Sequence, residues 1–106
     1  MDARLNLQSR HEAGKGVARK LRRAGRVPGV IYGAGRDPML VSMEAREAHN
    51  LFHAISLDDT VLHLAVDDGA TELATVQEVQ VHPFRTELLH VDFLRVGTEG
   101  SGGDTG

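Results

Sequence analysis

Hydrophobic and polar residues alternate along several short stretches of the chain, which is the period-two pattern of strands that bury one face. Leu5 and Leu7 alternate with polar residues and predict a first strand that leads into Arg10. The same alternation predicts further strands at residues 30–32, 39–43, 60–66, 72–81 and 87–96. Residues 67–70, Asp-Asp-Gly-Ala, have the composition of a hairpin turn. The pattern therefore favours a β-rich fold.

Two other stretches place their apolar residues at helical spacing. Residues 17–24 predict a short helix that is apolar on one side, and Gly25 stands where a C-terminal cap glycine belongs. Residues 44–55 predict a second amphipathic helix of about three turns, which Asp58 and Asp59 end. With about six strands and two or three short helices, the chain is predicted to be an α+β protein built on a small β-barrel.

Composition limits the size and setting of this fold. A chain of 106 residues suits one domain, expected over residues 1–96, followed by a flexible Gly-rich tail at 97–106. The absence of cysteine excludes disulfides and thiolate metal sites. No apolar stretch has the length of a signal peptide or a membrane span, so we expect a soluble cytoplasmic protein.

Charge is divided unevenly along the sequence. Residues 1–36 hold nine Lys or Arg against two acids, whereas residues 37–106 hold three against thirteen. Most of the early cations fall in one run: Lys15, Arg19, Lys20, Arg22, Arg23, Arg26 and Arg36. A compact basic patch on an otherwise acidic protein predicts a polyanionic partner, with nucleic acid as the first hypothesis. The acidic remainder would restrict docking to that patch.

The basic run opens with Gly14, Lys15 and Gly16. Glycines let a backbone come close to phosphate, and a helix that starts there offers free N–H groups. The motif lacks the spacing of a nucleotide-binding loop. Two alternatives remain for the run: a solvated surface helix, or a protein-interaction module in which the basic helix binds an acidic partner.

The last predicted strand carries a second candidate. Leu89, Val91 and Phe93 are expected on one face, which leaves His90 and Asp92 together on the other. Asp accepts hydrogen bonds from base N–H groups or a ribose 2′-hydroxyl, and His donates to base edges or phosphate. The pair could instead act as general acid and base in an RNA hydrolase, or simply bind each other on the surface.

Three further features leave their role open. An apolar phase shift within residues 72–81 predicts a β-bulge near Gln77, where Gln77 and Gln80 could read base edges or only decorate a strand. Tyr32 could stack on a base or sugar, or cap the core. His49 and His53 have a spacing that can bind zinc, but no third ligand is positioned, so no metal site or cofactor is expected.

Five short motifs follow one another in a specific order: Gly14-Lys15-Gly16, Leu21-Arg22-Arg23, Val27-Pro28-Gly29-Val30-Ile31-Tyr32-Gly33, Val79-Gln80-Val81-His82-Pro83 and His90-Val91-Asp92-Phe93. Together they resemble the bacterial large-subunit ribosomal protein twenty-five, or Ctc, family over roughly residues 3–96. The resemblance implies a small β-barrel with flanking helices. It also implies non-catalytic binding to the loop E region of 5S rRNA, in the central protuberance of the ribosome.

The resemblance further implies a set of RNA-binding residues: Arg10, Lys15, Arg19, Arg22, Tyr32, Gln77, His90 and Asp92. In this scheme the cations neutralise phosphates, the tyrosine contacts the backbone, and the last three residues read groove edges and 2′-hydroxyls. The implied partners are 5S rRNA with neighbouring large-subunit proteins and rRNA, for a chain that is monomeric when free. Long members of the family add a second β domain after the Asp-Phe strand, so the chain is expected to be a short form or to lack that domain.

Overall fold

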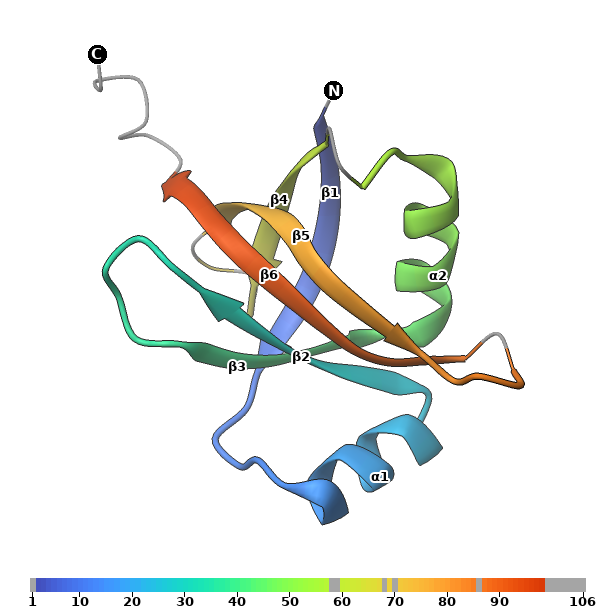
Figure 1. Ribbon diagram of the computed structural model, residues 1–106. Coiled ribbons are helices and arrows are strands. Elements are labelled where there is room, and N and C mark those ends of the chain that lie inside the picture. Colours follow the sequence, from blue (N-terminus) through green and yellow to red (C-terminus); the bar gives the residue numbers. More distant parts are fainter. Residues whose placement is uncertain (1, 58–59, 68, 70, 86, 99–106) are drawn as a thin grey trace.

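Six strands form a closed barrel in the computed structural model, and two helices lie on its outside (Figure 1). This count refers to the residues that the structure describes, which are 2–57, 60–67, 69, 71–85 and 87–98. The elements are β1 (Asp2–Ser9), α1 (Lys15–Arg23), β2 (Arg26–Tyr32), β3 (Met39–Glu44), α2 (Ala45–Ala54), β4 (Val61–Val66), β5 (Thr71–Val81) and β6 (Leu88–Thr98). The predicted α+β class with a small barrel is confirmed.

The strands follow one another around the barrel in the order β1-β3-β2-β6-β5-β4. β1 closes the barrel by pairing in parallel with β4, and β2 pairs in parallel with β6. The other neighbours are antiparallel. Closure leaves no edge strand among these six described strands, which suits a chain too short to cover edges with other elements.

Alternate residues of every strand fill the barrel, as the period-two pattern predicted. The buried strand residues at the centre of this core are Leu5, Leu7, Val27, Ile31, Val41, Met43, Leu62, Leu64, Val66, Ala74, Val91 and Phe93. From α2, Ala48 is fully buried and Leu51 and Phe52 pack against the same cluster. The outward residues of the strands are therefore free to form binding surfaces.

β5 contains the predicted bulge. Val76 pairs with Phe93 and Glu78 pairs with Asp92, so the ladder passes over Gln77. Gln77 and Glu78 are both exposed. The bulge thus presents two adjacent polar side chains on the outside of the barrel next to Asp92.

β6 has an irregularity that the alternation did not predict. The ladder skips Leu89 between the pairs made by Leu88 and His90. Leu88 packs against the core, whereas Leu89 lines a groove on the outer surface. The prediction that Leu89 shares a face with Val91 and Phe93 is wrong, because the skipped residue shifts the alternation by one.

Some boundaries also differ from the prediction. β2 begins at Arg26 and includes Pro28, which is tolerated because pairing with β6 starts only at Gly29 and Pro28 has a strand neighbour on one side. α1 begins at Lys15, where the Gly14 carbonyl accepts the Ala18 N–H at 3.0 Å.

Of the predicted ends of three elements, two involve residues outside those described. The cap after α1 is confirmed at Gly25, whose φ is +81° and whose N–H donates to the Arg22 carbonyl. α2 ends at Ala54, and the predicted helix stop at residues 58–59 lies outside the described residues. β6 extends to Thr98, and residues 99–106 of the predicted tail also lie outside them.

A buried ion cluster fixes the β2–β3 loop to one end of the barrel. The side chain of Arg95 is 1% exposed and donates to the carbonyls of Gly33 at 2.8 Å and Asp37 at 3.2 Å. Its Nε lies 3.5 Å from the Glu72 carboxylate, which also accepts two hydrogen bonds from Arg36. Each charge inside the barrel is therefore close to an opposite charge.

Candidate nucleic-acid interface

A groove of about 630 Å³ separates α1 from the barrel wall. It is lined by residues of the segment before α1, of α1 itself and of four strands: Arg10, Ala13, Gly14, Lys15, Ala18, Arg19, Arg22, Pro28, Val30, Leu40, Gln80, Leu89 and His90. Figure 1 shows α1 beneath the barrel, next to β2. Five predicted site residues from distant parts of the sequence thus meet across this groove: Arg10, Lys15, Arg19, Arg22 and His90.

The helix turns its basic side toward the barrel. Lys15, Ala18, Arg19 and Arg22 line the groove at positions i, i+3, i+4 and i+7, the spacing of one helix face. Such a face usually packs apolar side chains against a core. Three cations in this place give the groove a positive potential, so the geometry suits an anion between helix and barrel.

The larger apolar residues of α1 lie elsewhere. Val17 and Leu21 are half-buried and line a separate depression with Lys20 and Ala24. Three of the cations of α1, Lys15, Arg19 and Arg22, therefore face the barrel across the first groove, while Val17 and Leu21 lie on another side of the helix.

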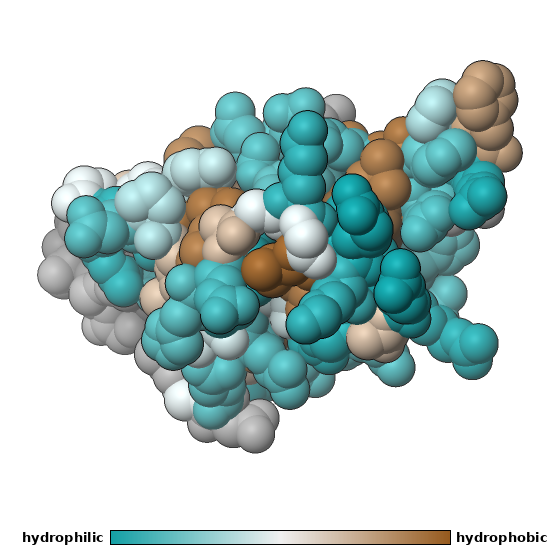
Figure 2. Space-filling model, turned by 90° about the horizontal axis from the view of Figure 1, so that it is seen from below, coloured by the Kyte–Doolittle hydropathy of each residue, from teal (hydrophilic) through white to brown (hydrophobic). Residues whose placement is uncertain are grey.

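The barrel side of the groove is largely apolar. Pro28 and Val30 of β2, Leu40 of β3 and Leu89 of β6 form this wall. Viewed from the α1 side, hydrophilic residues surround a small hydrophobic area near the centre of the molecule (Figure 2). Cations on one wall and apolar surface on the other match the phosphates and the sugar or base faces of a nucleic acid.

Three hydrogen bonds hold the Arg10 side chain against the barrel side of the groove. Its Nε donates to the Val41 carbonyl at 2.7 Å, Nη1 to Glu12 at 2.8 Å and Nη2 to Gly29 at 3.2 Å. Burial lowers the pKa of Arg10 from its ordinary value. Its first role is therefore to hold the segment that leads into α1, with its charge facing the groove.

Arg22 is also partly anchored. Its Nη1 donates to the carbonyl of Leu89 at 3.2 Å, which links the last turn of α1 to β6. The bond reaches the residue that the β6 ladder skips, and a skipped residue has a free backbone carbonyl. The irregularity in β6 thus helps to position a cation.

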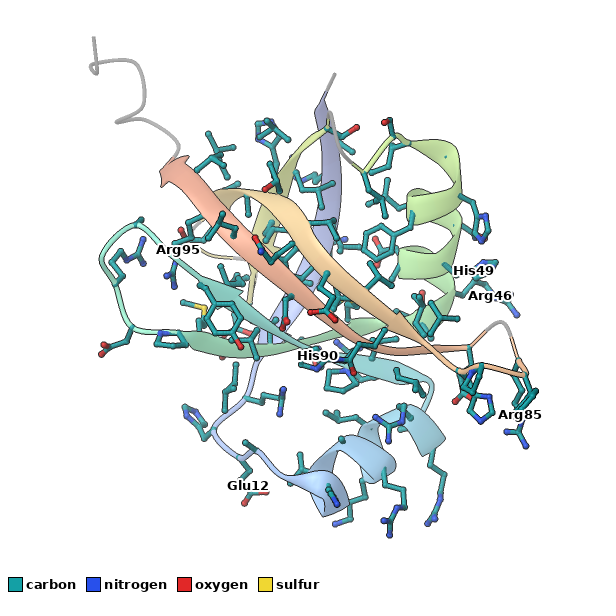
Figure 3. All side chains as sticks on the ribbon, in the orientation of Figure 1. Glu12, Arg46, His49, Arg85, His90 and Arg95 are labelled. Carbon is teal, nitrogen blue, oxygen red and sulfur yellow. The ribbon has the colours of Figure 1, made fainter. Side chains whose placement is uncertain are left out.

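His90 and Asp92 form a tight pair on the outer side of β6. Nε2 of His90 donates to Oδ1 of Asp92 across 2.6 Å. Their side chains are 27% and 17% exposed, and His90 lines the groove beneath the barrel (Figure 3). The carboxylate orients the imidazole ring and keeps a free acceptor edge, which suits recognition of N–H and 2′-hydroxyl groups.

Tyr32 and Gln77 do not line the groove, but the register places both near Asp92. Tyr32 is 39% exposed and lies two residues beyond Val30, the residue that pairs with Asp92 on the β2 side. Gln77 precedes the residue that pairs with Asp92 on the β5 side. The outer surface of β2, β6 and β5 thus extends the groove, and the roles of all eight predicted site residues stay predictions.

One polar lining residue was not in the predicted set. Gln80 pairs with His90 across β5 and β6 and is exposed in the groove. Its alternation with Val79 and Val81 was a signal for an outward side chain. Nothing in the alternation showed that α1 would lie opposite it.

Four cations of the basic run, Lys20, Arg23, Arg26 and Arg36, do not line this groove. Arg36 is bound by Glu72 at the far end of the barrel. Arg26 donates to the hydroxyl and carbonyl of Ser42. The prediction of one compact patch is therefore wrong for Arg36, because the β2–β3 loop carries it to a buried acid.

The described residues include no group of three or more His, Cys, Asp or Glu that could hold a metal ion. The rings of His49 and His53 contact each other, with centroids 4.3 Å apart. In the described part of the chain, neither helix is long and apolar enough to cross a membrane.

The fold and the groove together define a class: a small β-barrel protein with a cationic groove suited to a polyanion. The model of the Ribosomal L25p family matches residues 5–93, so the chain belongs to that family. Among relatives, the large ribosomal subunit protein bL25 of Rhodospirillum rubrum is 42% identical over 95 residues, which cover 90% of this chain and 45% of that protein.

Two further bL25 proteins show how the lengths compare. The Methylobacterium protein is 45% identical over 92 residues, covering 87% of this chain and 42% of that protein. The Chromobacterium violaceum protein is 40% identical over 100 residues, covering 91% of this chain and all of that protein. The chain thus spans less than half of the first two relatives, whereas the alignment covers the whole of the third.

Proposed function

We propose that the protein is a non-catalytic component of the large ribosomal subunit, located in the cytoplasm, and that it binds 5S rRNA at its loop E region in the central protuberance. Membership of the Ribosomal L25p family supports the ribosomal role. The observation that carries RNA binding is the basic face of α1, which Lys15, Arg19 and Arg22 turn toward an apolar barrel wall across an open groove.

In this mechanism the RNA backbone enters between α1 and the barrel. Lys15 and Arg19 neutralise phosphates, Arg10 and Arg22 add charge from anchored positions, and the apolar wall contacts sugars or bases. The outer surface around His90 and Asp92, extended by Tyr32 and Gln77, then reads groove edges and 2′-hydroxyls. The α1 contacts supply affinity, and the β6 pair supplies preference among RNAs.

The proposal is tested by equilibrium binding to 5S rRNA and to a transfer RNA of similar size, at near-physiological salt. We expect 5S rRNA to bind at least about tenfold more tightly. Arg19→Ala should weaken the binding of both RNAs. It should also reduce the slope of log K against log salt concentration by roughly 0.7 to 0.9 per lost phosphate contact. Asp92→Asn should mainly reduce the preference, because it removes a charged acceptor beside His90.

Equal binding of the two RNAs would contradict the proposal. A loss of preference in Arg19→Ala but not in Asp92→Asn would reject the division of roles. Thermal unfolding of each variant shows whether a weaker affinity reflects the interface or the fold.

A further inference from the structure

A second groove, of about 410 Å³, lies on the far side of Arg22 from the first. It is formed by the end of α1, the start of β2, the first half of α2 and the base of the β5–β6 hairpin: Arg22, Arg26, Val27, Ala45, Arg46, His49, Asn50, Glu87 and Leu88. Figure 3 shows Arg46 and His49 at the end of α2 that is nearer the hairpin carrying Arg85. No predicted site residue except Arg22 belongs to it.

Positive charge dominates this second groove. Arg22, Arg26 and Arg46 line it together with His49, and among the described residues of its lining Glu87 is the one acid. Glu87 lies 3.8 Å from Arg85, which offsets part of its charge. This excess of cations makes the groove a site for an anion.

Two of these arginines differ in how they are held. Arg26 is fixed by two hydrogen bonds to Ser42, at 2.9 Å and 3.0 Å, so its guanidinium is positioned before any ligand arrives. Arg46 is exposed and makes no hydrogen bond or ion pair with another described residue. A fixed cation and an uncommitted cation on opposite walls resemble the arrangement of Arg10 and Arg19 in the first groove.

Arg22 connects the two grooves, because it lines both of them. Its hydrogen bond to the Leu89 carbonyl holds the side chain on the ridge between them. A backbone that follows the cations of α1 through the first groove therefore meets the second one next. An acidic protein segment would also fit the charge, but it would not explain why one anchored arginine serves both grooves.

We propose that the second groove binds RNA phosphates that flank the segment held in the first groove, so that one RNA backbone passes over Arg22. Arg26 and Arg46 contact phosphate oxygens, and Asn50 and His49 add hydrogen-bond donors. This inference rests on the proposed function, since it places a further part of the same RNA in the second groove.

The test compares Arg46→Ala with the matched control Arg4→Ala, an exposed arginine of β1 that lines neither groove. Each is measured on intact 5S rRNA and on a short fragment that carries the loop E region with a few flanking base pairs. We expect Arg46→Ala to weaken binding to intact 5S rRNA by roughly three- to tenfold and to lower the salt slope by about one phosphate. For the fragment, the affinity of Arg46→Ala should equal that of the parent.

The outcomes separate this inference from the proposed function. If Arg46→Ala binds intact 5S rRNA like the parent while Arg19→Ala binds it weakly, the second groove is not an RNA site and the first one stands. If neither change matters, both proposals fail. Equal losses for Arg46→Ala and Arg4→Ala would mean a general charge effect and would also overturn the inference.

Discussion

Arg10 and Arg19 line the same groove with the same charge, but their surroundings differ. Three nitrogens of the Arg10 side chain donate hydrogen bonds to backbone carbonyls. Arg19, in contrast, is exposed and makes no hydrogen bond or ion pair with another described residue. Loss of Arg10 would release the segment before α1 as well as a charge. Arg19 is thus the better residue for measuring a phosphate contact alone.

Gly29 is a second position where one residue decides the geometry. A Cβ there would lie 2.7 Å from the Val91 carbonyl oxygen and 3.0 Å from the Met43 side chain. We expect Gly29→Ala to lower the free energy of unfolding by about 1 to 3 kcal/mol, because the parallel β2 and β6 backbones must separate to admit a methyl group. Denaturant unfolding measures this change.

The matched control is Gly16→Ala in the first turn of α1, where an added Cβ meets nothing within 4 Å. This change should stabilise the protein slightly, by up to about 1 kcal/mol, because alanine favours helix. Destabilisation of equal size in both variants would show that the close approach of Gly29 to β6 is not the cause.

At the scale of elements, an Asp67 side chain joins the end of β1 to the turn between β4 and β5. Its carboxylate accepts hydrogen bonds from the backbone N–H and the hydroxyl of Ser9. These bonds, the one from the hydroxyl first, lower the pKa of Asp67 below its ordinary value. The ionised carboxylate is therefore the form that supports barrel closure.

The sign of the pH dependence follows. A lowered pKa in the folded state contributes stability above the unfolded value of about 3.9, and this contribution is lost as pH falls through the lower folded value. We expect the melting temperature of Asp67→Asn to be lower than that of the parent at pH 7, and the difference between the two to shrink below about pH 4. Asp37→Asn, at an exposed position in the β2–β3 loop, is the control. A difference that stays constant from pH 7 to pH 3 would contradict this account.

The elements themselves were largely predictable, because alternation and helical spacing report which side chains a barrel must bury. The sequence predicted six strands, both helices and the bulge at Gln77, and the structure confirms them. It did not predict that the β6 ladder skips Leu89, since the skip depends on pairing with a distant strand. The orientation of α1 was missed for a similar reason: helical spacing finds an apolar side, but cannot tell that the basic side faces the barrel.

At the scale of the whole molecule, closure of the barrel brings the site together. β2 and β6 are far apart in sequence but pair in parallel, which places Val30 beside Asp92 and sets both above α1. The separation of charge along the chain is only partly a separation in space, because Arg36 pairs with the buried Glu72. Six other cations line the two grooves, which share Arg22: Arg10, Lys15, Arg19, Arg22, Arg26 and Arg46.

The central claim is that RNA lies between α1 and the barrel, and a change of shape without a change of charge tests it most directly. Ala18 is the small residue on the groove-facing side of α1, between Lys15 and Arg22. Ala18→Phe should fill part of the groove while leaving every cation in place. Ala24→Phe adds the same side chain at the exposed C-cap position directly after α1, outside the groove.

The decisive measurement is the affinity of these two variants for 5S rRNA, with thermal unfolding to confirm that both are folded. The account predicts that Ala18→Phe binds at least about tenfold more weakly than the parent, since the occupied groove no longer admits the backbone, and that Ala24→Phe stays within about twofold. Parent-like binding by a folded Ala18→Phe variant would place the RNA outside the groove and contradict the account.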